Sequence, residues 1–113
     1  MMKWFRVYSE IKDDPKMLEM DDHQRWLWIC LMSLANDSEL RGTILNVRLR
    51  GLASSLRTTE DKLREALELY QELDMAEYDE DARTITLLNF VKRQYDKPSD
   101  TPEQTRERQR MSR

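Results

Sequence analysis

The sequence is poor in residues that break helices and in residues that build reactive sites. Its 113 residues include only 2 Gly and 3 Pro, which predicts short loops and a mostly helical chain. With 1 Cys and 1 His, it can form no intrachain disulfide and no Cys/His metal cluster. Cys30 lies in the apolar segment WLWICLMSLA, which favours a buried small apolar residue over a reactive thiol.

Long apolar runs and catalytic motifs are also missing. No segment approaches the roughly 20 apolar residues that cross a bilayer, and we expect neither a signal peptide nor a membrane contact, hence a cytoplasmic protein. The sequence has no glycine-rich phosphate loop, and its single histidine accompanies no nucleophile. Its acidic pairs fall at expected helix starts or in a turn, where capping explains them. We therefore expect no enzyme, no cofactor and no metal, and favour a binding or assembly role.

The stretch from residue 42 to residue 90 carries an ordered series of patterns. Two sets of apolar residues have the spacing of helix stripes: Leu49, Leu52, Ala53 and Leu56, then Leu63, Ala66, Leu67, Tyr70 and Leu73. Between them, residues 57–59 fit only a tight turn, in which Thr58 or Thr59 caps the second helix. The segments MAEY and RTITLL flank the acidic turn DEDA, which predicts a hairpin. Helix, turn, helix and hairpin together predict a winged helix-turn-helix, mostly α with a small β-hairpin, in an α+β chain.

The segment before this motif supplies an arm and two further helices. Residues 1–95 form the expected domain, and KWFRVYSEI is expected to be an extended arm. Asp14 and Pro15 favour the start of a short helix, and Asp21 with Gln24 has capping-box spacing before a helix at 22–35. We expect the buried stripe of that helix to comprise His23, Trp26, Leu27, Cys30, Leu31 and Leu34.

The arm and the other side of this helix carry an excess of apolar side chains. Three short helices and a hairpin leave little room to cover them, so we expect self-association as a homodimer. The residues expected at that surface are Trp4, Phe5, Tyr8, Trp28, Ile29 and Met32. The alternative is that the arm belongs to the core of its own domain.

The charges around the second helix of the motif decide whether DNA binding is favoured. That helix enters the major groove in helix-turn-helix proteins, and the candidate DNA contacts here are Arg48, Arg50, Arg57, Thr58, Thr59, Lys62 and Arg64. Residues 59–74, however, include 2 basic and 6 acidic side chains, which repel phosphate. The alternative is that these charges form an ordinary solvated helix face with no role in reading DNA.

Further basic residues follow the hairpin. The candidates are Lys92 and Arg93, then Arg106, Arg108 and Arg110 in the segment 96–113, which we expect to be a flexible basic tail. Residues 97–113 hold 5 Lys and Arg against 3 Asp and Glu, a balance of +2, whereas residues 1–96 hold 14 against 19, a balance of −5. A basic tail beside an acidic body is a plausible way to hold DNA weakly.

Two segments also resemble a known family. The sequences KWFRVYSEIKDDPKM and NFVKRQYDKPSDTPEQTRERQR are similar to those that flank the amino-terminal winged helix of phage and prophage replication-initiation proteins, the replisome organisers related to DnaD-like primosomal proteins. The matching positions are Trp4, Phe5, Arg6, Tyr8, Asp14, Pro15, Lys16, Asn89, Phe90, Lys92, Arg93, Gln94, Tyr95, Arg106, Arg108 and Arg110.

The resemblance implies origin or single-strand DNA binding, self-association, and recruitment of a replicative helicase or its loader. The sequence stops after the arginine-rich segment, without the second domain that contacts the helicase in the fuller architecture. It is therefore either a fragment or a short protein of the same ancestry. Two alternatives stay open, a protein–protein oligomerisation module with little DNA affinity and a small winged-helix transcriptional regulator.

Overall fold

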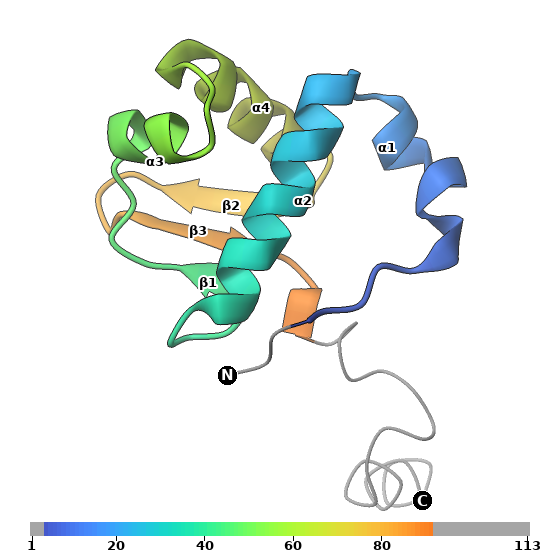
Figure 1. The fold of residues 1–113 in the computed structure, drawn as a ribbon, viewed down its shortest axis with the longest axis horizontal. Helices are drawn as coiled ribbons and strands as arrows, with labels where there is room; N and C mark the ends of the chain where they lie inside the picture. Colours follow the sequence, from blue (N-terminus) through green and yellow to red (C-terminus); the bar gives the residue numbers. More distant parts are fainter. Residues whose placement is uncertain (1–3, 92–113) are drawn as a thin grey trace, which may run out of the picture.

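The computed structural model describes residues 4–91, which form helices packed on a small antiparallel sheet (Figure 1). The elements in chain order are η1 (Ser9–Asp13), α1 (Pro15–Leu18), α2 (Asp22–Asp37), β1 (Thr43–Ile44), α3 (Leu49–Ser55), α4 (Glu60–Glu72), β2 (Ala76–Asp79) and β3 (Thr84–Leu87). This is an α+β chain with winged-helix topology, so the predicted fold class is confirmed. The tail predicted at 96–113 lies outside the described residues.

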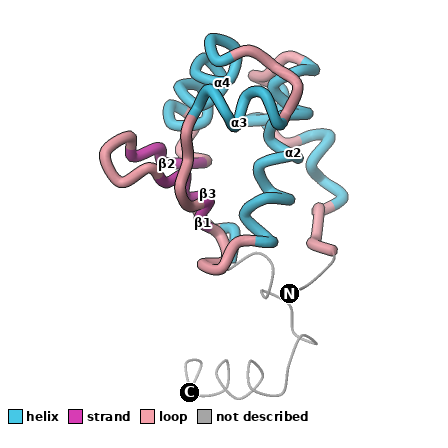
Figure 2. The backbone as a smooth tube through the Cα atoms, turned by 60° about the vertical axis from the view of Figure 1, so that its left-hand side comes forward, coloured by secondary structure: helices cyan, strands magenta, loops and turns pink. Residues whose placement is uncertain are grey.

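The sheet has the strand order β1-β3-β2 and lies on one side of the helices (Figure 2). In the hairpin, Tyr78 pairs with Ile85, and on the other side Ile44 pairs with the same residue. The side chain of Asp79 accepts a hydrogen bond from the amide of Ala82 at 2.9 Å, which closes the predicted acidic turn. Strand β1 is not among the elements predicted from the sequence.

Each α-helix start predicted from a capping signal is capped as expected. Asp14 accepts a hydrogen bond from the amide of Lys16 at 2.8 Å, with Pro15 in the first turn. Asp21 and Gln24 form a reciprocal capping box on α2. Thr59 caps α4 through the amide of Lys62 at 3.1 Å. These side chains satisfy amides that a helix start leaves unpaired, which fixes where each helix begins.

Helices α3 and α4 end in the same left-handed turn. After α3, the amide of Thr58 donates to the carbonyl of Ala53 at 2.9 Å, and Arg57 has a φ of 59°. After α4, the amide of Met75 donates to the carbonyl of Tyr70 at 2.8 Å, and Asp74 has a φ of 59°. Glycine is the usual residue at this position. Its scarcity in this sequence leaves an arginine and an aspartate there instead.

The core joins α2, α4 and the sheet. Its largest fully buried side chains are Tyr70, Leu27, Leu31, Leu63, Leu67 and Ile85. The Tyr70 ring lies 5.0 Å from that of Trp28, centroid to centroid. Its hydroxyl donates to the carbonyl of Gln24 at 2.6 Å. Burial raises the pKa of this hydroxyl far above its ordinary value, so α2 and α4 are joined by a neutral phenol.

The orientation of α2 corrects the predicted buried stripe. Trp26 is 58% exposed, whereas Trp28 and Met32 are 7% and 8% exposed and lie in the core. Cys30 is half-buried, which raises the pKa of its thiol. The side of α2 that carries Trp28 faces Tyr70, so Trp26, two residues away and about 200° around the helix, turns outward. A helix apolar nearly all round gave no pattern from which to choose between these two faces.

The amino-terminal arm lies against its own domain, the alternative left open above. Phe5 packs on the core, and the side-chain amide of Asn36 donates to the carbonyl of Trp4 at 3.3 Å. The prediction that Trp28 and Met32 lie at a self-association surface is therefore wrong, because both are buried. Phe5 and Ile29, also predicted there, pack against the core. Trp4 and Tyr8 stay candidates.

Candidate nucleic-acid interface

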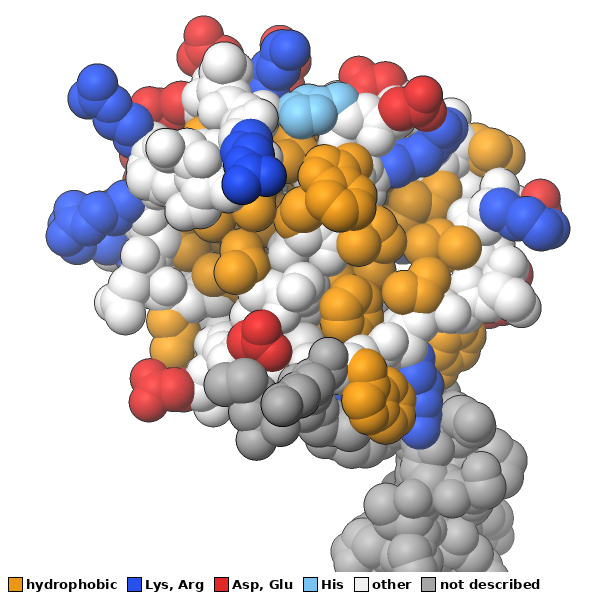
Figure 3. Space-filling model, in the orientation of Figure 1, with side chains coloured by type: hydrophobic (Ala, Val, Ile, Leu, Met, Phe, Trp, Pro, Cys, Tyr) orange, Lys and Arg blue, Asp and Glu red, His pale blue; other side chains and the backbone are white. Residues whose placement is uncertain are grey.

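Four basic side chains stand exposed around α3 and the turn into α4. They are Arg48, Arg50, Arg57 and Lys62. Within residues 4–91, none of them makes a side-chain hydrogen bond or ion pair with another described residue. Figure 3 shows Lys and Arg side chains projecting at the upper left, over α3 and α4. Positive groups without internal partners are available to phosphate.

A fifth basic residue, Arg83, lies close to the start of α3. The amide of Val47 donates to the carbonyl of Arg83 at 2.8 Å. Arg83 ends the hairpin turn, directly before β3, so this bond places the turn end of the hairpin beside Arg48, the residue that precedes α3. Arg83 is exposed. The start of α3 and the turn end of the hairpin thus bring three arginines together, with Arg50 in the first turn of the helix. Only the tertiary bond at Val47 reveals this grouping.

Three of the predicted DNA contacts are already engaged within the domain. The Nε2 atom of His23 and the Oγ1 atom of Thr58 lie 2.8 Å apart. Thr59 holds the first turn of α4 as its cap. Arg64 donates to the carboxylate of Glu60 at 3.1 Å, and this hydrogen bond raises the pKa of the guanidinium. These side chains fix the turn and the start of α4, which is a structural role.

The solvent-facing side of α4 is acidic. Asp61, Glu65, Glu68 and Glu72 are all exposed, and their spacing of four, three and four residues places them in one stripe. Residues 4–91 hold 11 Lys and Arg against 18 Asp and Glu, a net charge of −7. The hairpin tip adds Asp79, Glu80 and Asp81. This stripe opposes insertion of α4 along a DNA groove, because it would face phosphate at close range.

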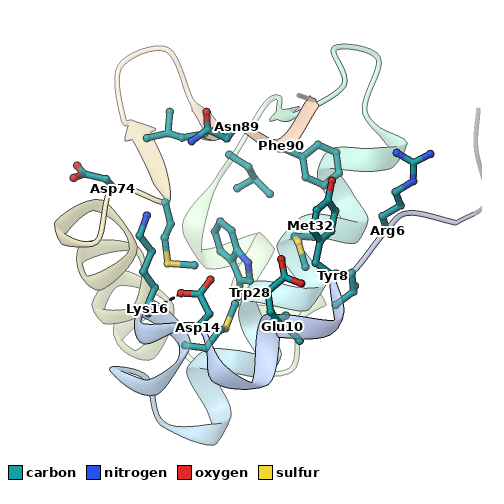
Figure 4. A pocket seen from close by; sticks show the side chains of 16 residues that line it. Arg6, Tyr8, Glu10, Asp14, Lys16, Trp28, Met32, Asp74, Asn89 and Phe90 are labelled. Carbon is teal, nitrogen blue, oxygen red and sulfur yellow. Dashed lines mark hydrogen bonds between the residues drawn. The ribbon is translucent and has the colours of Figure 1, made fainter. Parts of the chain in front are cut away.

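A cavity lies between the amino-terminal arm and the body of the domain (Figure 4). Its volume is about 140 Å³, and Trp28, Met32 and Phe90 supply apolar lining. Arg6 and Glu10 stand on its arm side. No histidine or cysteine lines this cavity, and residues 4–91 contain no cluster of acidic, His or Cys side chains that could hold a metal.

Comparisons with protein-family models, with curated proteins and with solved structures found no match to this chain. Within the described range, no helix is both long and apolar enough to pass through a bilayer. The later candidates Lys92, Arg93, Arg106, Arg108 and Arg110 lie outside residues 4–91. The described site therefore consists of the arginines and Lys62 around α3.

Sequence reasoning also missed the outward side of α2. In Figure 3 a band of hydrophobic side chains crosses the centre of the view, where Figure 1 places α2. The outermost large residue on this helix is Trp26. The two tryptophans of the segment WLW must face opposite sides of a helix, which was the available signal. Burial was predicted for Trp26, whereas Trp28 is the buried one.

Proposed function

We propose that this domain binds DNA and assembles with other proteins, in the class of phage-type replication initiators or replisome organisers. Its DNA contacts are phosphate contacts made by the start of α3, the α3–α4 turn and Arg83 at the end of the hairpin turn. The assignment to replication, and to a helicase or helicase loader as partner, rests on the sequence resemblance alone. The DNA contact rests on the placement of the basic side chains.

The observation that carries the DNA proposal is the exposure of unpartnered positive charge around α3. Arg48, Arg50 and Arg57 have no carboxylate partner among residues 4–91, although the same part of the chain holds 18 Asp and Glu. Elsewhere, Arg25 pairs with Asp22 and Arg64 with Glu60. Guanidinium groups left free on an acidic domain are suited to a polyanion.

The acidic stripe determines how DNA is approached. Phosphates lie near the start of α3 and the turn, while Glu65, Glu68 and Glu72 point away from the duplex. Such an end-on contact fixes position without reading base edges, so the proposed affinity is weak, salt-dependent and nearly independent of sequence.

The backbone at Arg57 makes this position suitable for a test. A non-glycine residue in the left-handed region costs about 1 kcal/mol. The sequence places an exposed arginine there, with a φ of 59° and no described side-chain partner. Asp74 has the same φ at the end of α4, so the backbone conformation belongs to the helix-ending turn and indicates no function by itself. It does mean that a change to glycine should have opposite effects on stability and on DNA binding.

The test separates binding from stability at this one position. Arg57→Gly should raise the free energy of unfolding by about 0.5–1 kcal/mol and weaken binding to a duplex. Arg57→Lys keeps both the charge and the strained backbone, so it is the matched control and should bind nearly as well as the wild type. Binding is measured by fluorescence anisotropy at about 50 and about 200 mM salt.

A double variant extends the test to the start of α3. Arg48→Ala combined with Arg57→Ala should weaken binding by a similar factor on different DNA sequences. The slope of log affinity against log salt should become shallower by about one for each lost contact. An unchanged slope would remove both arginines from the DNA-facing surface, and wild-type protein without measurable affinity would refute the proposal.

A second candidate function is protein–protein assembly with little DNA affinity. The observation that favours it is the acidic stripe on α4, at the position where DNA-reading helices carry groups that contact bases. If the anisotropy experiment shows no binding, this second candidate replaces the first.

A further inference from the structure

The outward face of α2 is uncharged in a domain rich in charge. We define this face as Trp26, Cys30 and Ser33, with Ile29 and Leu34 at its edges. The three central positions lie within about 60° of one another around the helix axis. Between Asp22 and Asp37, the two ends of the helix, the face carries no charged side chain. A solvent-facing helix side normally bears charge.

One end of the face carries a large exposed side chain, and the other end carries a small one. Trp26 is 58% exposed near the start of α2, whereas the exposed residues of the last turns are the small Ser33 and, at the helix end, Asp37. Large and small side chains on one face are self-complementary when two copies are related by a two-fold axis across the helix. Such an axis, passing between Cys30 and Ser33, places each Trp26 over the last turns of the other α2.

Among the described residues, the Trp26 end of the face offers an unpaired cation and the other end offers unpaired carboxylates. The hydrogen-bond contact between His23 and Thr58 holds the α3–α4 turn beside the start of α2, so the exposed Arg57 lies at the Trp26 end. At that end, Asp21 serves as a cap and Asp22 pairs with Arg25. The other end carries the exposed Asp37 and Glu39. Antiparallel pairing brings Arg57 of one copy towards these carboxylates of the next.

We propose that the outward face of α2 is the contact surface for a second copy of this chain, joined antiparallel about a two-fold axis near Cys30. This replaces the arm and the buried face of α2 as the self-association surface. The inference does not depend on DNA binding. The dimer engages Arg57, so in the dimer the exposed basic residues around α3 that stay available to DNA are Arg48, Arg50 and Lys62. The tests use no DNA except as a competing explanation.

Two tryptophans with equal exposure provide the central comparison. Trp26 and Trp4 are each 58% exposed, but Trp4 lies on the arm. Truncation of an interface tryptophan often costs about 2 kcal/mol or more of binding free energy, which is roughly a 30-fold loss of affinity. Sedimentation equilibrium of the full chain across the micromolar range should show a dimer. Trp26→Ala should weaken the dimer by that factor, and Trp4→Ala should leave it unchanged.

The single cysteine reports on the position of the axis. A short bismaleimide crosslinker should join two wild-type chains through Cys30, at a pH high enough to ionise a thiol whose pKa burial raises. Trp26→Ala should abolish the crosslink at the same protein concentration. Cys30→Ser should remove it while leaving the sedimentation result unchanged, which separates the chemistry of the probe from the interface.

A charge exchange tests the antiparallel direction. Asp37→Arg and Arg57→Glu should each weaken the dimer, and the double variant should recover it, because the two residues meet across the axis. Recovery would not occur if each charge contacted only its own domain. All variants are checked by circular dichroism, and since these side chains are exposed, the fold should be retained.

Three results would overturn the proposal. The first is a wild-type chain that stays monomeric throughout the micromolar range. The second is a dimer lost in Trp4→Ala but kept in Trp26→Ala, which would return self-association to the arm. The third is quenching of tryptophan fluorescence by a thymidine oligonucleotide that disappears in Trp26→Ala, without any dimer, which would make Trp26 a stacking platform for single-stranded DNA.

Discussion

Replacing Tyr70 by phenylalanine removes one oxygen atom from the contact between α2 and α4. The ring stays buried against Trp28, so what is lost is the hydrogen bond from the hydroxyl to the carbonyl of Gln24 at 2.6 Å. A buried neutral hydrogen bond contributes about 0.5–1.5 kcal/mol net. The carbonyl of Gln24 still accepts from the amide ladder of its own helix. We therefore expect Tyr70→Phe to lower the free energy of unfolding by about 1 kcal/mol at neutral pH.

The same substitution has a signature at alkaline pH. Burial raises the pKa of the Tyr70 hydroxyl in the folded state, while in the unfolded chain it is about 10. The folded state therefore holds the proton more tightly, and the stability from this group is complete below about pH 10. It is lost as the pH rises from there towards the folded pKa, by up to about 1.4 kcal/mol per pH unit.

The phenylalanine variant has no such loss. The difference in free energy of unfolding between the wild type and the variant should therefore shrink above about pH 10 and reverse sign near about pH 11. The assay is urea unfolding followed by circular dichroism on both chains from neutral to alkaline pH. All other titrating groups are common to both chains and cancel in the difference. A difference that stays constant across the whole range would refute the assignment of a buried, neutral Tyr70 hydroxyl.

Four further substitutions test the packing, a helix cap and one backbone position, each by urea unfolding. Leu67→Ala should lower the free energy of unfolding by about 2–5 kcal/mol, because Leu67 is fully buried between the helices. Trp26→Ala should change the free energy of unfolding of the monomer by less than about 0.5 kcal/mol, because its side chain faces solvent. Thr59→Ala should cost about 0.5–2 kcal/mol through loss of the α4 cap. Gly42→Ala should cost about 1–2 kcal/mol, since Gly42 has a φ of 96° and an added Cβ would lie 3.0 Å from Val91.

Local signals in the sequence predicted most of the fold. The residues Asp14, Asp21 and Thr59 act within a few positions of themselves, so their capping roles follow from spacing alone. The hairpin likewise follows from alternation on either side of an acidic turn. Strand β1 escaped prediction because its two residues become a strand only by pairing with β3, a contact between segments about forty residues apart.

The orientation of α2 needed tertiary information. Trp26 and Trp28 have equal claims to burial in the sequence, and the ring of Tyr70 decides between them by packing on Trp28. The candidate DNA contacts divide for a similar reason. Thr58 and Arg64 are occupied by His23 and Glu60, and a pattern of charges along the chain does not show which of them already have partners.

The most direct test of the central claim is an amide chemical-shift titration of the labelled chain with a short DNA duplex. The account predicts that the largest changes occur at residues 48–50, at the turn 57–59, at Lys62 and at Arg83, and that the exposed acidic residues of α4 from 65 to 72 change little. Changes concentrated on residues 65–72, or no changes at millimolar duplex, would contradict the proposed phosphate contact around α3.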